Sequence, residues 1–188
     1  MLYTGKGDKG TTTAFGCNQT RISKSSELPE ALGALDELNA FIGFVKMRAQ
    51  HQIRFGAGRA ADSERIGGIL RDIQENLFII QAETAGADKR LKEGIVEEIG
   101  KIVNDIEKEI PPIKGFSIAG GTELSALLDV ARTLARRAER RIIAVQEAKL
   151  RELSPKTMAY MNRLSSLLFA LARLANHQAG VAEENPKY

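Results

Sequence analysis

The stretch ELSALLDVARTLARRAERRIIAVQEAK, residues 123–149, decides the fold of this chain. Its apolar residues recur every three or four positions, which is the period of a helix with one buried face. A second stripe carries Asp129, Arg132, Arg136, Glu139 and Arg140 at the same helical spacing. The stretch therefore predicts a long amphipathic helix that buries one side in a core and presents arginines on another.

The rest of the chain shows this helical period in four more stretches. We expect helices over residues 26–49, 64–85, 91–110 and 154–178, and a surface loop over residues 50–63. A proline pair follows the third of these helices, and a serine–proline step begins the last. Long helices with almost no strand predict an all-α fold, for which a five-helix antiparallel bundle is the economical architecture.

Composition limits the kind of protein. The chain has 188 residues, is 43% hydrophobic and 27% charged, and has a net charge of +3, which together are typical of one soluble globular domain. We expect a single domain over 1–188, with an N-terminal loop over 1–25, a helix bundle over 26–180 and a tail over 181–188. The single cysteine, Cys17, excludes an internal disulfide and fits a cytoplasmic location. No apolar run approaches the ~20 residues that span a bilayer, so we expect no membrane partner.

The N-terminal stretch TGKGDKGTTT, residues 4–13, combines three glycines with two lysines and four threonines. Free backbone N–H groups, hydroxyls and ammonium groups together suit a chain of phosphates. The alternative is a polar, frayed terminus, and composition alone does not choose between the two. We expect this glycine-rich loop (residues 4–13) to have no strand to anchor it.

The arginine stripe offers a second anion site. Arg132 and Arg136 lie one helical turn apart, and guanidinium groups match phosphate oxygens in a two-pronged geometry. The alternative is a solvated face with local pairs, Asp129 with Arg132 and Arg136 with Glu139. Each interpretation remains open on the stripe alone.

Three further polar residues are candidates for a role in binding. Asp36 and Glu37 are possible partners of the arginines or outer-sphere groups for Mg²⁺, and equally an ordinary acidic helix face. Asn162 either is satisfied within the bundle or hydrogen-bonds a ligand. We find no Ser-His-Asp arrangement, no HExxH motif, no P-loop and no candidate set of metal ligands.

Four blocks, taken in order, resemble one family. They are YTGKGDKGTT at 3–12, ALGALDELNAFIG at 31–43, FSIAGGTELSALLDVARTLARRAER at 116–140 and YMNRLSSLLFALAR at 160–173. Their combination resembles the PduO-type ATP:cob(I)alamin adenosyltransferases. Any one block alone would be a weak signal, but together they span nearly the whole chain.

The resemblance implies a fold, a reaction and partners. The fold is a five-helix bundle that assembles as a homotrimer, with active sites between adjacent subunits. The reaction transfers the 5′-deoxyadenosyl group of ATP to Co(I) of cob(I)alamin in the presence of Mg²⁺ and releases triphosphate. Co(I) is the nucleophile, so the protein needs no nucleophilic side chain. Expected partners are a corrinoid reductase and an adenosylcobalamin-dependent enzyme, without nucleic acid or membrane.

The resemblance also implies roles for residues by position. Arg132 and Asp36 match an intersubunit ion pair that orders the site. Phe116 matches a residue that lines the corrinoid pocket and helps displace the lower axial ligand, which gives a four-coordinate Co(II) species that is easier to reduce. Arg136 matches a residue of the catalytic site and of the ATP site. The remaining ATP contacts implied are Thr4, Gly5, Lys6, Gly7, Thr12, Thr13, Lys24, Arg137, Glu139, Arg140 and Asn162.

The chain departs from the family pattern at a few positions. It has Ala119 where proline is usual, Asp129 where histidine is frequent and Ser166 where aspartate is frequent. The loop reads TGKGD where TRTGD or TKTGD is more usual, which affects side-chain contacts at Gly5 and Lys6. The changes at 129 and 166 concern the corrinoid side of the site.

Two other functions compete with the enzyme. A non-catalytic chaperone that binds nucleotide or corrinoid and delivers adenosylcobalamin to a mutase would fit the changes at positions 129 and 166. A basic helical module that binds nucleic acid is disfavoured by the mild net charge and the few aromatic residues. For the enzyme, we expect the glycine-rich loop to be mobile without nucleotide and to order over ATP at a subunit interface.

Overall fold

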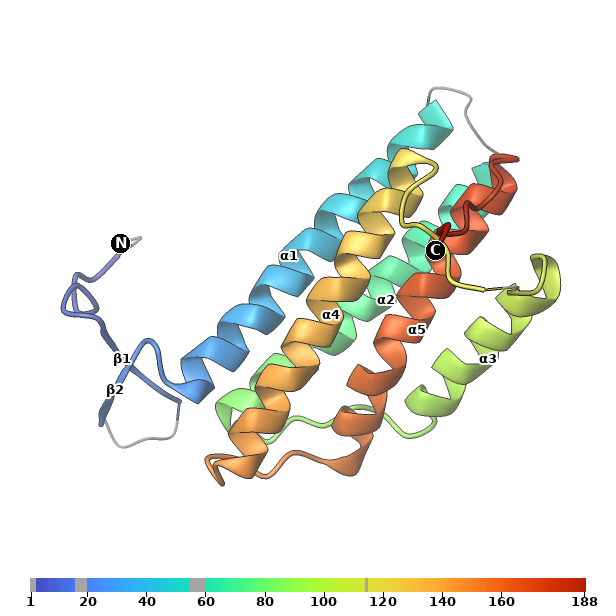
Figure 1. The fold of residues 1–188 in the computed structure, drawn as a ribbon. Helices are drawn as coiled ribbons and strands as arrows, with labels where there is room; N and C mark the ends of the chain where they lie inside the picture. The colour runs from blue at the N-terminus through green and yellow to red at the C-terminus, as the bar shows by residue number, and fades with distance from the viewer. Residues whose placement is uncertain (1–2, 16–19, 55–59, 114) are drawn as a thin grey trace.

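The protein is a bundle of five helices with a small N-terminal hairpin (Figure 1). The computed structural model describes residues 3–15, 20–54, 60–113 and 115–188. The prediction of an all-α fold with five helices is confirmed. The helices are α1 Glu27–Arg54, α2 Ala60–Ala85, α3 Ile95–Glu109, α4 Glu123–Glu147 and α5 Pro155–Gln178.

The helices alternate in direction along the chain. α1, α2, α4 and α5 lie side by side, and α3 packs against α5 (Figure 1). These last two neighbours run in the same direction. Lys156, at the start of α5, donates to the carbonyl of Leu91 just before α3, and Arg173, near the end of α5, donates to the carbonyl of Pro111 just after it.

The helix boundaries differ from the expected ones mainly around the first connection. α1 continues to Arg54 and α2 begins at Ala60, so residues 50–54 and 60–63 of the expected loop over 50–63 are helical. The two helices still pack together there, because the side chain of Gln50 lies beside Gly67. α3 begins later than expected because Gly94, with φ of 77°, interrupts the helical backbone. Cys17 and residues 55–59 lie outside the described residues.

The expectation that no strand anchors the glycine-rich loop was wrong. Strand β1, Thr11–Thr13, pairs antiparallel with strand β2, Arg21–Ser23, with Thr12 opposite Ile22. Three consecutive β-branched threonines favour the extended conformation, and pairing satisfies their backbone groups. The hairpin projects away from the bundle at the start of α1 (Figure 1).

The core is formed by the leucine and isoleucine stripes that the helical period predicted. Leu35 and Ile42 of α1, Leu77 of α2 and Ile142 of α4 are fully buried. Tyr160 of α5 is also buried, and this burial raises the pKa of its hydroxyl well above the ordinary value, so the phenol stays neutral in the core. No helix of the described residues is both long and apolar enough to cross a membrane.

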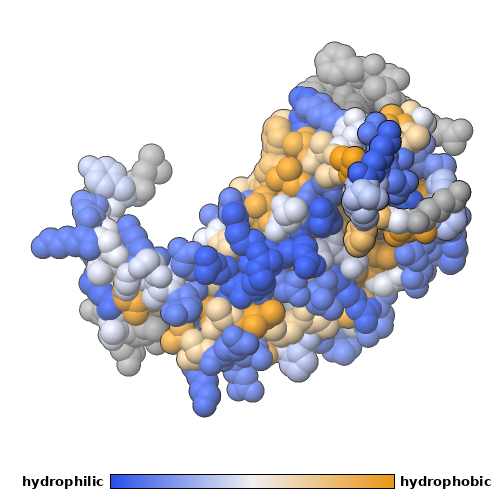
Figure 2. All heavy atoms as spheres, viewed as in Figure 1, coloured by the Kyte–Doolittle hydropathy of each residue, from blue (hydrophilic) through white to orange (hydrophobic). Residues whose placement is uncertain are grey.

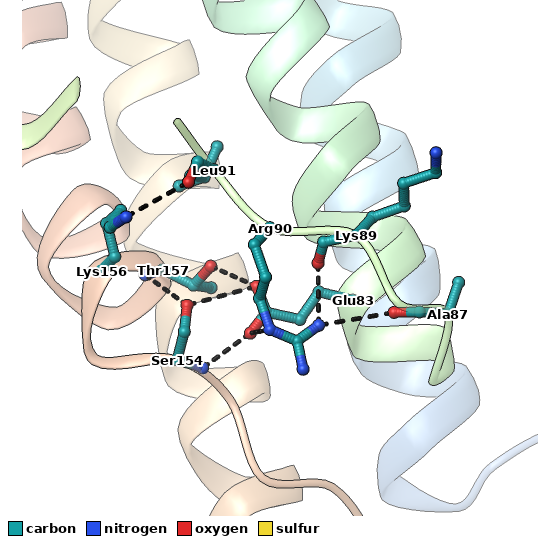
Figure 3. Close-up of polar contacts among 8 residues, drawn as sticks. All are labelled: Glu83, Ala87, Lys89, Arg90, Leu91, Ser154, Lys156 and Thr157. Carbon is teal, nitrogen blue, oxygen red and sulfur yellow. Dashed lines mark hydrogen bonds and ion pairs between the residues drawn. The ribbon is translucent and has the colours of Figure 1, made fainter. Parts of the chain in front are cut away.

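A buried carboxylate ties α2 to the start of α5 (Figure 3). Glu83 has a side chain only 1% exposed, and its Oε1 accepts from the backbone N–H of Ser154 over 2.6 Å. Its Oε2 accepts from the hydroxyl of Thr157 over 2.6 Å, and Arg90 lies 3.7 Å from Oε1. A negative charge at a helix N-terminus is favourable, because unpaired N–H groups point towards it. The sequence alone gave no reason to select this glutamate.

Candidate functional site

A cavity of about 580 Å³ opens between α4, α5 and the segment that joins α3 to α4. One side is aromatic and another carries two arginines, so the cavity suits a ligand that is partly apolar and partly anionic. We call it the arginine pocket. Its lining residues are Ile113, Gly115, Phe116, Ser117, Arg132, Arg136, Ser165, Ser166 and Phe169.

Arg132 is held in place on the wall of the arginine pocket. Its Nε donates to Oδ1 of Asp129 over 3.1 Å, which is the local pair that the sequence offered as an alternative. Its guanidinium carbon lies 6.0 Å from the ring centroid of Phe169, within the range of a cation–π contact. Asp129, one of the departures from the family pattern, therefore orients an arginine of the pocket.

Arg136 lies one turn further along α4 and lines the same pocket. Within the described part of the chain its guanidinium has no hydrogen bond or ion pair, so the local pair with Glu139 that the alternative interpretation offered does not form. An exposed guanidinium that lines a pocket without a partner is available to bind an anion with both prongs of its fork. Arg136 is therefore the strongest candidate for an anion contact in this pocket.

The side chains of the RRAERR run, residues 136–141, lie on two different faces of α4. Arg137 forms an ion pair with Glu37, and Arg141 lies 3.5 Å from Glu30, so both point to α1 and away from the arginine pocket. Glu37 is thus an arginine partner, as one of its three interpretations proposed. The ATP role expected of Arg137 stays a prediction, and this single chain gives it a structural partner instead.

Glu139, Arg140 and Asn162 are not lining residues of the pocket. Glu139 is half-buried and Arg140 is exposed on α4, and neither side chain has a partner among the described residues. Asn162 is exposed on α5, one turn before the pocket residue Ser166, so both lie on one face of that helix. Their predicted contacts with ATP stay predictions.

Asp36 lies exposed on α1 and does not meet Arg132 within the chain. Arg132 is occupied by Asp129 instead. An Asp36–Arg132 pair was expected between subunits, so it stays a prediction for the assembled protein.

Phe116 is 79% exposed and is presented to the arginine pocket by the segment between α3 and α4. The C-terminal tail holds this segment from outside. Nδ2 of Asn185 donates to the carbonyl of Phe116 over 2.7 Å, and the N–H of Ile118 donates to the carbonyl of Glu184 over 2.8 Å. The tail over residues 181–188, for which the sequence predicted no role, therefore supports the aromatic wall of the pocket.

Two polar residues of α5 hold the same segment from inside. Arg173 is buried; its Nε donates to both carboxylate oxygens of Glu183, over 2.7 and 3.0 Å, and its Nη2 donates to the carbonyl of Pro111 over 2.9 Å. Nδ2 of Asn176 donates to the carbonyl of Gly120 over 2.9 Å. A side chain at Gly121 would collide with Asn176, because its Cβ would lie 2.5 Å from Oδ1.

Sequence reasoning missed Arg173, Asn176 and the tail. The available signal was the presence of an arginine and an asparagine in the otherwise apolar stretch 167–176. Buried polar groups require partners, so such residues mark segments that fold back onto the helix.

The glycine-rich loop forms two successive turns. The N–H of Asp8 donates to the carbonyl of Gly5 over 3.2 Å, and that of Gly10 to the carbonyl of Gly7 over 3.1 Å. Lys24 lies over the second turn, since a Cβ on Gly7 would come within 2.9 Å of its Nζ. Gly7 and Lys24, both expected to contact ATP, are therefore neighbours.

Thr4, Gly5, Lys6, Thr12 and Thr13 belong to the same hairpin as Lys24. Among the residues that the structure describes, no hydrogen bond or ion pair joins residues 3–13 to α4. The hairpin stands off the bundle and leaves a hollow beside α1 (Figure 2). The two predicted phosphate-binding elements are thus both present, but one chain does not bring them together.

The described residues contain no group of three or more His, Cys, Asp or Glu side chains that could hold a metal ion. The donor set of the site consists of arginines, lysine, hydroxyls and backbone groups. It suits an anion rather than a bare cation.

A helical bundle with an arginine-lined pocket and a separate glycine-rich loop is the arrangement expected of a protein that binds an anionic ligand with an apolar portion. The chain belongs to the cobalamin adenosyltransferase family, whose sequence profile matches residues 2–175. The predicted family is confirmed.

Named relatives agree with this assignment. The chain is 34% identical to the corrinoid adenosyltransferase of Bacillus subtilis over 97% of its own length and 90% of the relative's. It is 36% identical to the corrinoid adenosyltransferase PduO of Salmonella typhimurium, over 99% of this chain and 54% of that relative. The chain thus spans about half the length of this longer relative.

A solved structure has the same fold. A variant PduO-type ATP:corrinoid adenosyltransferase from Lactobacillus reuteri, complexed with cobalamin and ATP, superimposes with a TM-score of 0.85 at 28% identity. The match covers 100% of both chains. The five-helix bundle described above is therefore the fold of this family.

Proposed function

We propose that the protein transfers the 5′-deoxyadenosyl group of ATP to Co(I) of cob(I)alamin, which gives adenosylcobalamin and triphosphate. The observation that carries this proposal is the arginine pocket, where Phe116 and Arg136, which has no partner among the described residues, line one cavity in a chain of this family. An aromatic surface suits the corrinoid, and a guanidinium suits the phosphates of the other substrate.

The chemistry requires little covalent participation by the protein. Co(I) of the substrate attacks the ribose C5′ of ATP, a Co–C bond forms, and the C5′–O bond breaks with the electron pair leaving on triphosphate. Arg136, with Lys24 and the glycine-rich loop, binds and stabilises the departing triphosphate. The remaining residues position the two substrates at reacting distance.

Mg²⁺ would accompany ATP and neutralise part of the triphosphate charge. The described residues offer no cluster of carboxylates for the ion. This fits an ion held by phosphate oxygens and water, which is how Mg²⁺ commonly binds with nucleotides. Of the two acidic candidates on α1, Asp36 is the one available for an outer-sphere contact, because Glu37 is paired with Arg137.

We further propose a homotrimer with the site between subunits. The hairpin stands apart from Arg136 in one chain, so a neighbouring chain has to supply one of the two elements. Exposed apolar side chains support such contacts, with Phe44 and Met47 on α1 and Phe78 on α2. Figure 2 shows apolar surface over α1 beside the hollow. Sedimentation equilibrium tests the assembly, and a monomeric mass would contradict it.

On this proposal the chain acts as one functional domain, with the loop over 1–25, the bundle over 26–180 and the tail over 181–188. It would work in the cytoplasm, receive Co(I) corrinoid from a reductase and pass its product to an adenosylcobalamin-dependent enzyme. Location follows from reduced-corrinoid chemistry, which requires a reducing compartment. Fractionation of cells that produce the protein tests the location.

The purified protein should convert cob(I)alamin to adenosylcobalamin only when ATP and Mg²⁺ are both present. The absorption spectrum of cobalamin under strictly reducing, anaerobic conditions measures this conversion. An unchanged spectrum with ATP present would exclude the enzyme. Conversion limited to one corrinoid per site would favour the chaperone, for which Ser166 on the pocket wall is the supporting observation.

Replacing Phe116 with alanine should affect the corrinoid and spare ATP. With cob(II)alamin and a reductant, we expect turnover to fall by about 10–100-fold, because the apolar side chain no longer excludes a lower ligand from cobalt. With cobalamin already reduced to Co(I), the loss should be smaller. The KM for ATP should not change.

Ile118→Ala is the matched control for this variant. Ile118 lies on the same segment and is 54% exposed, but it does not line the pocket. Equal losses in both variants would indicate disturbance of the segment and would contradict a specific role of Phe116.

A further inference from the structure

The side chain of Arg21 is committed to the backbone of the glycine-rich loop. Its Nε donates to Oγ1 of Thr11 over 2.8 Å, and its Nη2 donates to the carbonyl of Thr11 over 2.7 Å and to the carbonyl of Lys6. Lys6 lies in the first turn of the loop, and Thr11 is where β1 begins. One guanidinium therefore bridges the two ends of segment 6–11.

This arrangement differs from that of an arginine that binds phosphate. Arg136 keeps its fork unpaired among the described residues, whereas Arg21 directs its donors at carbonyl oxygens and a hydroxyl. Carbonyl oxygens carry partial negative charge, so a phosphate would not share that position. Arg21 thus organises the loop from behind and leaves phosphate contact to other groups.

The composition of the glycine-rich loop explains why hydrogen bonds from Arg21 are needed to hold its shape. Three glycines in residues 4–13 allow the backbone many conformations. This freedom is lost when a ligand orders the loop, and the loss costs conformational entropy. The turns that end at Asp8 and Gly10 are single backbone hydrogen bonds, and the N–H of Lys24 donates to the carbonyl of Gly10 over 3.0 Å. Arg21 adds the connection between the two ends of the segment.

We propose that Arg21 is a positioning residue for nucleotide binding, which holds the glycine-rich loop in its binding shape by bridging Lys6 and Thr11 without touching the nucleotide. The nature of the nucleotide rests on the proposed function, whereas the bridging does not. A loop that is already shaped loses less conformational entropy when it binds, so its affinity is higher.

Kinetic measurements distinguish a positioning role of Arg21 from a role as a positive charge that attracts ATP. In Arg21→Gln and in Arg21→Lys, the KM for ATP should rise about ten-fold, because only a fraction of the loops is competent to bind. The kcat at saturating ATP should stay within about two-fold and the KM for cob(I)alamin should not change, since bound ATP restores the loop. Lysine keeps the charge but has a single nitrogen, so it cannot reproduce the contact of Nε with the Thr11 hydroxyl together with the contacts of Nη2 with the two carbonyls.

Arg163→Gln is the matched control. Arg163 is an exposed arginine on α5 that also donates to a backbone carbonyl, that of Val96, over 3.1 Å. It lies away from the hairpin, so its loss should leave the KM for ATP and the loop unchanged. Circular dichroism should show the same helical content in all variants, because Arg21 is exposed and outside the bundle.

Limited proteolysis without any substrate gives a second readout. Trypsin cleavage after Lys6 and Lys9, followed by mass spectrometry, should be about ten-fold faster in both Arg21 variants than in the wild type, because cleavage follows the population of open loop. ATP should slow cleavage in every chain. The Arg163→Gln control should match the wild type.

The outcomes are distinct. Wild-type KM and cleavage rate in Arg21→Gln, or their full recovery in Arg21→Lys, would overturn the positioning role. Absence of turnover in the wild type would overturn the proposed function alone, and faster cleavage in the variants would then still support the bridge. If the helical content of Arg21→Gln differs from that of the wild type, the KM for ATP and the cleavage rate of Arg21→Lys test the positioning role in its place.

Discussion

Replacing Arg136 with alanine is expected to lower kcat/KM for adenosyl transfer by about 10²–10³-fold and to leave the fold intact. Arg136 lines the arginine pocket and has no partner among the described residues, so nothing structural depends on it. Charge builds up on triphosphate as the C5′–O bond breaks, and a guanidinium placed beforehand stabilises that charge. Steady-state kinetics under reducing conditions measure the effect.

Two further variants identify the cause of this loss. Arg136→Lys keeps the charge and loses the two-pronged geometry, so its kcat/KM should lie between those of the wild type and of the alanine variant. Arg141→Ala is the matched control, because Arg141 lies on the same helix but points to Glu30 of α1, 3.5 Å away. It should keep near wild-type kinetics.

The result for Arg136→Ala is decisive in both directions. Near-normal kinetics with unchanged helical content would remove Arg136 from the site. A loss shared equally by Arg141→Ala would indicate a general effect of charge on α4, not a contact with the leaving group.

Replacing Glu83 with alanine is expected to lower the free energy of unfolding by about 2–4 kcal/mol. The carboxylate is almost fully buried and accepts from Ser154 and Thr157, so its removal leaves a backbone N–H and a hydroxyl without partners (Figure 3). Chemical denaturation at fixed protein concentration measures the change, and the melting temperature should fall by roughly 5–15 °C.

Glu75→Ala on the same helix is the control for Glu83. Glu75 has a side chain 59% exposed, and its one ion pair among the described residues is with Arg71, one turn earlier. An exposed ion pair of this kind contributes at most about 1 kcal/mol. Equal stability losses in the two variants would contradict the structural role assigned to Glu83. Glu83→Gln keeps one acceptor oxygen and should fall between the wild type and Glu83→Ala.

Much of the fold followed from local pattern. The five apolar stripes predicted the helices because a helix places residues three and four apart on one face, whatever lies around it. The stripe on 123–149 also put Arg132 and Arg136 on one side, and the structure places both in one pocket with Phe116. The pattern placed the helix boundaries incorrectly where the apolar period faded, at the end of α1 and the start of α2, because a helix can continue through residues that bury no apolar stripe.

The sequence by itself therefore determined where the five helices lie, which of their apolar residues face the core, and which family the blocks resemble. The tertiary structure alone decided which neighbour each polar side chain meets. It sends Arg137 to α1 and Arg136 to the pocket, buries Glu83 at the start of α5, and folds the tail onto the segment that carries Phe116. The physical reason is range: helical period depends on residues a few positions apart, whereas these partners lie tens of residues apart in the chain and meet only once the helices have packed.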